Sequence, residues 1–356
     1  MEVRIINGPK ELANAFSDIF KKKTLDIRAK TEGNPIKDPT VRLQEYLDKR
    51  NSPVPEFKLN PINLDELKEI MSKKLKTSKV NGFDYIDSFS LKLAFPHIEG
   101  VLLHLVNLSL TSSKFAKNWK NQLIIPLHKK NDKLDGSNYR PVSHIVQVSK
   151  IVEYAVHKQV YDHFIQNNLF HPNHHGFLGD HNTATALIQL HDMFLEATED
   201  KELSAAILLD LSAAFDVVDH EILLKKLRIY NFSEQSVQWF ASYLEERKMY
   251  VQVESKLSDP STNEDIGVPQ GSILGPLLFV IFGNDLPACN NDDEDIENED
   301  IENEDIDDNN TINENNTGEA VLYADDNTGH VRAKHSEDLV RKIQQHADFI
   351  GRLLGD

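Results

Sequence analysis

Residues 321–326 read VLYADD and place two adjacent carboxylates, Asp325 and Asp326, directly after a short run of strand-forming residues. The polar residues 327–329 (NTG) precede Val331, so the pattern predicts a β-hairpin with the acid pair in its turn. Neighbouring side chains on a strand point to opposite faces, and two adjacent acids act together only where a turn lets both approach one point. A divalent cation is the common reason to hold like charges this close; the alternative is a solvated Asp-Asp turn.

A third carboxylate follows a second apolar run. Residues 206–210 (AILLD) predict a buried strand with Asp210 at its end. Three acids from a strand and a hairpin meet the requirement of a two-metal phosphoryl-transfer site, in which one ion activates a 3′-hydroxyl and the other stabilises pyrophosphate. Between them, residues 267–279 (GVPQGSILGPLLF) form a Gly/Pro loop that leads into an apolar segment, where Gly271 lets the backbone approach a flat ligand.

These three stretches resemble motifs A, B and C of the reverse transcriptases of non-LTR retrotransposons. The matching words are DLSAAFDVVDH at 210–220, GVPQGSILGPLLF at 267–279 and YADD at 323–326, in that order. Residues 118–142, which contain NWK, IPL, KK and NYRP, resemble the fingers signature of the same family. The resemblance covers roughly residues 60–350 and is similar to the jockey-type LINEs.

The resemblance implies an α+β fold: a right-hand polymerase with fingers and palm, whose palm is a ferredoxin-like antiparallel sheet backed by helices. We expect an N-terminal helix and linker over 1–60, fingers over 61–205 and an incomplete palm over 206–356. The strand that carries Asp210 should be central and should neighbour the acidic hairpin. Because the sequence ends 30 residues after Asp326, we expect truncation after motif C, with motif D, the primer grip and the thumb absent, and no upstream endonuclease.

The implied reaction is RNA-templated addition of deoxynucleotides to a primer 3′-hydroxyl. Its partners would be an RNA template, a DNA primer or target DNA, and dNTPs. Asp210, Asp325 and Asp326 would be catalytic and would hold two Mg²⁺ ions, with the carbonyl of Leu211 as a further ligand and Mn²⁺ as a substitute ion.

Six further residues would bind the nucleotide by resemblance: Lys129, Lys130, Arg140, Phe215, Gln270 and Gly271. Arg140 and one of the two lysines would grip the phosphates, and the sequence does not choose between the lysines. Phe215 would pack under the sugar and exclude a 2′-hydroxyl, while Gln270 and Gly271 would contact the templating pair and the incoming nucleotide. The alternatives are an exposed basic hairpin and an ordinary core phenylalanine. Asp216 and Asp219 lie past the strand and are interpreted as structural.

The charge is unevenly distributed. The formal net charge is −18, yet residues 1–166 carry 27 Lys and Arg against 19 Asp and Glu. Residues 291–317 hold 13 acids and no basic residue, including the tandem repeat IENED at 296–305. This composition predicts a disordered acidic insert within the palm, without which the net charge would be −5. A basic N-terminal half therefore remains to face a nucleic acid.

The single cysteine, Cys289, excludes a disulfide framework and a cysteine-based zinc site, and favours a reducing compartment. Neither a signal-peptide core nor a run of 18 apolar residues is present, so we expect an intracellular protein of the nucleus and/or cytoplasm with no membrane partner. Near residues 176–177 (GF), a zinc cluster is an alternative to structural roles for four histidines: His171, His174, His175 and His181.

Hydrophobic periodicity and capping signals predict the remaining elements. Helices are expected over 9–20, 64–77, 91–110, 148–166, 183–199, 220–230, 234–244 and 336–354, with strands in 118–132, from Tyr139 and over 249–253. Residues 21–23 (KKK) either end a solvated helix or touch a phosphate backbone, and the stretch to Pro55 predicts a linker or an extended arm.

Three departures from the family pattern stand at Leu178, Ala213 and residues 282–283 (FG), where Arg, Lys and Tyr-Ile are usual. Leu178 removes one basic template contact. Three functional hypotheses follow: a reverse transcriptase domain, a catalytically inactive retrotransposon remnant that lacks motif D and thumb, and an acidic interaction protein on a palm scaffold.

Overall fold

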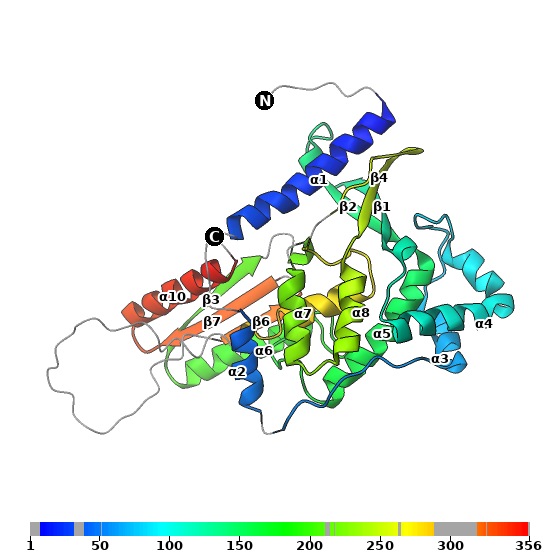
Figure 1. The fold of residues 1–356 in the computed structure, drawn as a ribbon. Coiled ribbons are helices and arrows are strands. Elements are labelled where there is room, and N and C mark those ends of the chain that lie inside the picture. Colours follow the sequence, from blue (N-terminus) through cyan, green and yellow to red (C-terminus); the bar gives the residue numbers. More distant parts are fainter. Residues whose placement is uncertain are drawn as a thin grey trace. The chain divides into compact units, whose positions relative to one another are not determined.

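The computed structural model describes residues 8–31, 39–50, 52–210, 214–216, 218–262, 265–287, 319–324 and 326–354 (Figure 1). The chain divides into two compact units. Unit 1 comprises Met1–Gly33, Arg50–Phe170 and Ala213–Phe282, and unit 2 comprises Asn34–Lys49, His171–Ser212 and Gly283–Asp356. The acidic insert predicted over 291–317 lies outside the described residues, and the division into fingers and palm stays a prediction.

Unit 1 contains a four-stranded sheet with the order β2-β1-β4-β5. The strands are β1 (Asn121–His128), β2 (Tyr139–Ile145), β4 (Lys248–Val253) and β5 (Lys256–Leu257). β1 pairs antiparallel with β2, as the sequence predicted, and parallel with β4. The long helix α1 (Pro9–Thr31) lies along this sheet in Figure 1, and its Phe16 is buried against Ile124 and Val251.

The remaining helices of unit 1 surround an aromatic core. They are α3 (Leu64–Glu69), α4 (Ser88–Ser112), α5 (Gln147–Gln166), α7 (His220–Ile229), α8 (Glu234–Leu244) and α9 (Leu274–Phe282), with the shorter turns η1 (Ile70–Lys74), η2 (Lys117–Lys120), η3 (Gly136–Asn138) and η4 (Ala214–Asp216). The largest fully buried side chains of this unit include Trp239, Tyr243 and Phe164. Ring contacts such as Trp239 on Tyr243, 5.6 Å apart, bury large apolar areas and stabilise the helix packing.

Local capping explains where the helices begin. Asn63 accepts a hydrogen bond from the backbone N–H of Glu66, and the Glu66 carboxylate accepts one from the backbone N–H of Asn63. This reciprocal box satisfies two amides that the first turn of a helix leaves without partners. Asn182 caps α6 (Thr183–Glu199) in the same way. Both helices begin where capping signals in the sequence predicted, at residues 64 and 183.

Unit 2 is built on a three-stranded antiparallel sheet with the order β3-β7-β6. Its elements are α2 (Pro39–Asp48), α6 (Thr183–Glu199), β3 (Leu203–Asp210), β6 (Glu319–Tyr323), β7 (Asp326–Ala333) and α10 (Ser336–Leu354). Helix α6 contacts His330 through Phe194, whereas His346 of α10 packs against Gly329. Adjacent strand residues point to opposite faces, so the two helices cover opposite faces of the sheet.

Two predictions about these elements were wrong. The stretch 24–55 is not a plain linker, because α1 continues to Thr31 and α2 forms with Leu43 and Leu47 buried one helical turn apart. The strand with Asp210 is not central: within the described residues β3 is an edge strand and β7 lies between β3 and β6. Its predicted position beside the acidic hairpin is confirmed.

Helix α4 has the length and composition of a membrane-spanning helix, and it alone does so among the residues that the structure describes. Its sequence contains no uninterrupted apolar run of 18 residues, because charged and polar residues such as Lys92 and Glu99 interrupt it. One helix of this kind is weak evidence for a membrane span, since helices of water-soluble proteins pass the same test.

Candidate functional site

Two of the three predicted acids are neighbours in the sheet of unit 2. Asp210, the last residue of β3, is the register partner of Asp326, the first residue of β7. Tyr323 at the end of β6 is paired with Asp326 from the other side. The turn contains Ala324 in a left-handed conformation, with φ of 59°. Asp325 and Leu211 lie outside the described residues, so the backbone register concerns Asp210 and Asp326 alone.

This backbone register makes residues 210 and 326, both aspartates in the sequence, direct partners on adjacent strands. Directly opposed residues of an antiparallel pair project from the same face, with Cβ atoms about 4.5–5.5 Å apart. Two like charges in this position destabilise the pair unless a cation compensates them. Asp326 is exposed and accessible to such an ion. Within the described residues no group of three or more acids, histidines or cysteines is placed to hold a metal; the chemistry of the two opposed acids fits a divalent cation.

The turn between β6 and β7 is held from outside by the segment that contains Gly176. His175 donates its backbone N–H to Leu322 O at 2.7 Å, and Leu322 donates its own to Asn173 O at 2.9 Å. A Cβ on Gly176 would lie 2.0 Å from the backbone nitrogen of Ala324. Only glycine lets the two backbones come this close. The GF motif at 176–177 therefore supports the acidic hairpin.

The histidines around this segment are buried or hydrogen-bonded to other groups of unit 2. Burial lowers the pKa of His174 to about 3 and that of His171 to about 4, so both rings are neutral at pH 7. The His175 ring contacts Thr185 Oγ1 and Gln189 Oε1 through its two nitrogens. Because no metal-binding group of three forms in the described part of the chain, the zinc alternative gains no support.

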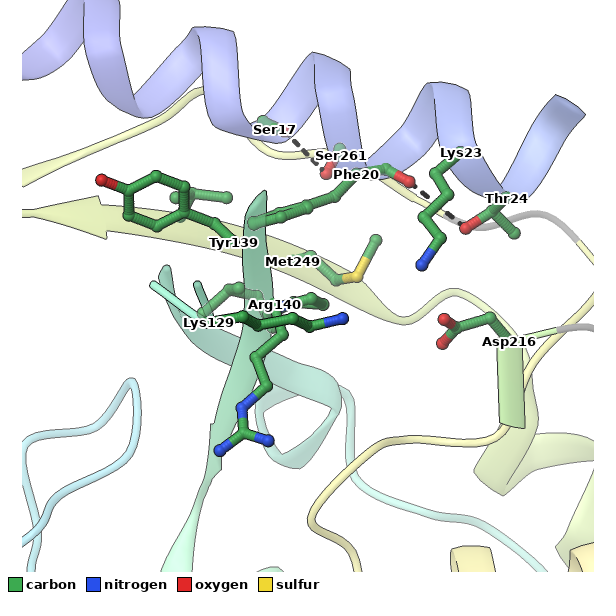
Figure 2. Close-up of a pocket in the computed structure, with 13 residues that line it drawn as sticks. Ser17, Phe20, Lys23, Thr24, Lys129, Tyr139, Arg140, Asp216, Met249 and Ser261 are labelled. Carbon is green, nitrogen blue, oxygen red and sulfur yellow. Dashed lines mark hydrogen bonds between the residues drawn. The ribbon is translucent and has the colours of Figure 1, made fainter. Parts of the chain in front are cut away.

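A pocket of unit 1 contains two of the predicted phosphate-binding residues. It encloses about 590 Å³ including open solvent, and Lys129 and Arg140 line it, whereas Lys130 does not. In Figure 2 both residues lie on the side of the pocket opposite α1, and the Arg140 side chain extends away from that helix. The full lining is Ser17, Phe20, Lys23, Thr24, Ile124, Lys129, Tyr139, Arg140, Pro141, Asp216, Met249, Val251 and Ser261.

The turn after motif A is tied to the motif B loop. Phe215 stacks on Phe279 with ring centroids 5.0 Å apart, and its carbonyl accepts the backbone N–H of Val268 at 2.8 Å. Gln270 donates from Nε2 to Asp216 Oδ1 at 2.7 Å. Burial raises the pKa of Asp216. The sequence-based interpretation of Asp216 as structural therefore missed that this residue lines the pocket. Its contact with Gln270 joins two separate motifs, and no local sequence pattern around Asp216 predicts it.

Asp219, by contrast, has a structural role, as interpreted from the sequence. It caps α7 by accepting the backbone N–H of Ile222 at 2.9 Å. Gly271 has φ of 77°, and a Cβ there would lie 3.0 Å from the carbonyl oxygen of Ser143. Both the left-handed conformation and the close backbone approach favour glycine, which agrees with the predicted special role of this position.

Beneath the motif B loop lies a buried charged network. Glu153 of α5 is 0% exposed, and its Oε2 accepts the backbone N–H of Ile273 at 2.8 Å, just before α9. Tyr243 Oη lies 3.4 Å from the same oxygen. Burial raises the pKa of Glu153, while the Arg247 guanidinium and the backbone donors oppose that rise. This network anchors the start of α9 and so positions the loop that carries Gln270.

Comparison with known proteins gives one family and several relatives. The family model described as reverse transcriptase (RNA-dependent DNA polymerase) matches residues 127–353. A probable RNA-directed DNA polymerase from transposon BS of Drosophila melanogaster is 31% identical over 289 residues, 80% of this chain and 31% of the relative. The RNA-directed DNA polymerase from mobile element jockey of Drosophila melanogaster is 32% identical over 69% of this chain and 26% of the relative. Its Drosophila funebris counterpart is 33% identical over 65% of this chain and 25% of the relative. The chain thus spans a quarter to a third of these relatives.

Proposed function

Because this chain belongs to the reverse transcriptase (RNA-dependent DNA polymerase) family and is of the jockey-like, non-LTR type, we propose that it extends a DNA primer on an RNA template. The substrates are dNTPs, and the partners are the RNA template and a DNA primer or target DNA. The observation that supports the proposal is the backbone register of Asp210 with Asp326, which pairs two aspartate positions of distant segments on adjacent strands.

In the proposed reaction Asp210 and Asp326, together with Asp325 and the carbonyl of Leu211, hold two Mg²⁺ ions. When bound, such ions would lower the pKa of the attacking 3′-hydroxyl and would stabilise the negative charge on the leaving pyrophosphate. The chain's own contribution would be the backbone pairing of β3 with β7, which makes residues 210 and 326 register partners before any substrate arrives. The chemistry of these oxygen donors suits Mg²⁺, and Mn²⁺ as a substitute.

The nucleotide is bound by residues of unit 1. Lys129 and Arg140 hold its phosphates, in keeping with the cationic pocket that both line. Lys130 takes a peripheral electrostatic role, since it lies outside the lining. The ring of Phe215, held flat against Phe279, limits the space at the sugar. Gln270 and the exposed backbone at Gly271 contact the base pair.

The mixed α/β architecture with antiparallel sheets agrees with a polymerase palm. Within the proposal, the α+β fold is a right-hand polymerase in which the sheet of unit 2 belongs to a ferredoxin-like palm and the β1–β2 hairpin belongs to the fingers. The nucleus and/or the cytoplasm is the proposed location. The inactive remnant and the acidic interaction protein are not favoured, because no observation beyond the sequence departures and the acidic segment supports them.

Primer extension on poly(rA)/oligo(dT) with Mg²⁺ tests the proposal. The wild-type chain is expected to add dTMP, and Asp210→Asn and Asp326→Asn are each expected to reduce addition to background. Glu319→Gln is the matched control, because Glu319 is an exposed acid on β6 whose register partner is His330. Equal counts from the wild type and both aspartate variants would remove the enzymatic claim.

A further inference from the structure

We propose that Lys23 of α1 is a third cation of the nucleotide pocket and binds the triphosphate together with Lys129 and Arg140. The inference rests on the proposed function for the identity of the ligand, a nucleoside triphosphate. It goes beyond that function because α1 lies outside the part of the chain that the family model matches, residues 127–353. In this proposal α1 forms one wall of the nucleotide pocket.

The position of α1 on the sheet is fixed by a row of contacts along the helix. Lys10 Nζ lies 2.8 Å from Asp259 Oδ1, and Asn14 exchanges hydrogen bonds with the side chain and backbone of Asp259. Ser17 Oγ lies 3.1 Å from Ser261 Oγ. The Phe16 ring meets the Tyr139 ring edge-on at 4.8 Å. These contacts occur in each helical turn from residue 10 to residue 17 and fix the direction of the helix axis. The following turns therefore lie at the pocket, where Lys23 is a lining residue.

The pocket has more positive charge than its own residues neutralise. Lys23, Lys129 and Arg140 line it with one carboxylate, Asp216. Burial raises the pKa of Asp216, and the hydrogen bond from Gln270 and the Lys23 charge partly oppose that rise, so the ammonium acts on that wall of the pocket. None of the three cations forms an ion pair within the described residues. Three available cations around one space suit a polyanion.

Two of the three cationic side chains point into one space. In Figure 2 the Lys23 side chain descends from α1 toward Asp216, and the Lys129 ammonium points to the same space beside Met249. The Arg140 guanidinium extends away from α1. Flexible ammonium groups on two sides and a planar guanidinium further along can contact successive phosphates. Lys23 is the member of the 21–23 lysine run that faces the pocket.

Binding of inorganic tripolyphosphate to the full-length chain, measured by calorimetry in low salt without primer or template, tests the inference. Lys23→Gln is expected to weaken binding roughly five- to tenfold, and this difference should vanish near 1 M salt, where charges are screened within about 3 Å. Lys22→Gln is the matched control, since it removes the same charge from the same helix without touching the lining. Lys23→Arg keeps the charge and should bind like the wild type.

Two results would overturn the inference: equal affinities for Lys23→Gln and Lys22→Gln, or no tripolyphosphate binding by the wild type. The outcome is separable from that of the proposed function. Primer extension by the wild type with no effect of Lys23→Gln on the KM for dTTP would leave the polymerase and remove the role of Lys23. Lys23-dependent tripolyphosphate binding in a chain that cannot extend a primer would do the reverse.

Discussion

Replacing Glu153 with glutamine is expected to destabilise unit 1 by about 3 kcal/mol, the lower end of the range for leaving a buried charge uncompensated, because the Glu153 and Arg247 charges act on each other inside the core. The carboxylate is 0% exposed, and it accepts the backbone N–H of Ile273 at 2.8 Å. Arg247 is 7% exposed, and its Nε and Nη2 have no hydrogen-bond partner among the described residues. Glutamine keeps one acceptor oxygen but leaves the guanidinium charge buried without a compensating charge.

The pair is tested by a double-mutant cycle. Arg247→Met leaves the Glu153 charge buried alone and should also destabilise unit 1, whereas the double variant removes both charges and should lose less than the sum of the two. We expect a coupling of about 1–3 kcal/mol. Urea unfolding followed by tryptophan fluorescence reports on unit 1 specifically, because both tryptophans, Trp119 and Trp239, belong to it.

A loss below about 1 kcal/mol for Glu153→Gln would refute the reasoning. It would mean that the raised pKa of Glu153 leaves the folded protein with a neutral carboxyl group at pH 7, so that glutamine mimics the native state. Additive losses in the cycle would show instead that Glu153 and Arg247 do not interact.

Three other predictions concern both units. Because the pKa values of His171 and His174 are depressed to about 4 and about 3, the unfolded state binds more protons below pH 6.5. Unit 2 should therefore lose about 2 kcal/mol per histidine between pH 7 and 5, seen as lower hydrogen-exchange protection factors, relative to the intrinsic rate at each pH, in β6 and β7. Equal protection factors at pH 7 and pH 5 would contradict this. Asp216→Asn keeps an acceptor for Gln270 but removes a negative charge, so tripolyphosphate should bind about fivefold more tightly in low salt; weaker binding would contradict the cationic pocket. Gly176→Ala forces apart two backbones now in contact and should destabilise unit 2 by about 1–3 kcal/mol in urea, whereas Gly100→Ala, with open space around it, should not destabilise the fold.

Where a local pattern decides the structure, the sequence was sufficient. The apolar run before Asp210 and the strand-forming run 321–323 predict β3 and the acidic hairpin, and capping signals predict where the helices from Leu64 and from Thr183 begin. The pairing of β3 with the hairpin followed from the carboxylates, because three acids of a metal site have to meet. The edge position of β3 did not follow, since the order of strands in a sheet depends on long-range packing.

The parts that sequence reasoning missed depend on contacts between distant segments. Helix α2 was not predicted, because the surrounding stretch is rich in residues typical of linkers. The spacing of Leu43 and Leu47 does place both on one helix face, where they are buried. Helix α1 packs on the sheet through contacts such as that between Ser17 and Ser261, which are 244 residues apart in the sequence. No local sequence pattern predicts such a contact. The hydrogen bond of Gln270 to Asp216 likewise connects two motifs that are 54 residues apart.

The most direct measurement of the central claim, that Asp210 and Asp326 share a divalent metal, is iron-directed cleavage of the backbone. Fe²⁺ substituted for Mg²⁺, with ascorbate and peroxide, generates radicals that cut the chain only near the bound ion. We expect two cuts, one near residue 210 and one near residue 325; excess Mg²⁺ should suppress both, and Asp326→Asn should abolish both. A single cut, or two cuts that persist in Asp326→Asn, would show that the opposed acids do not bind one metal site.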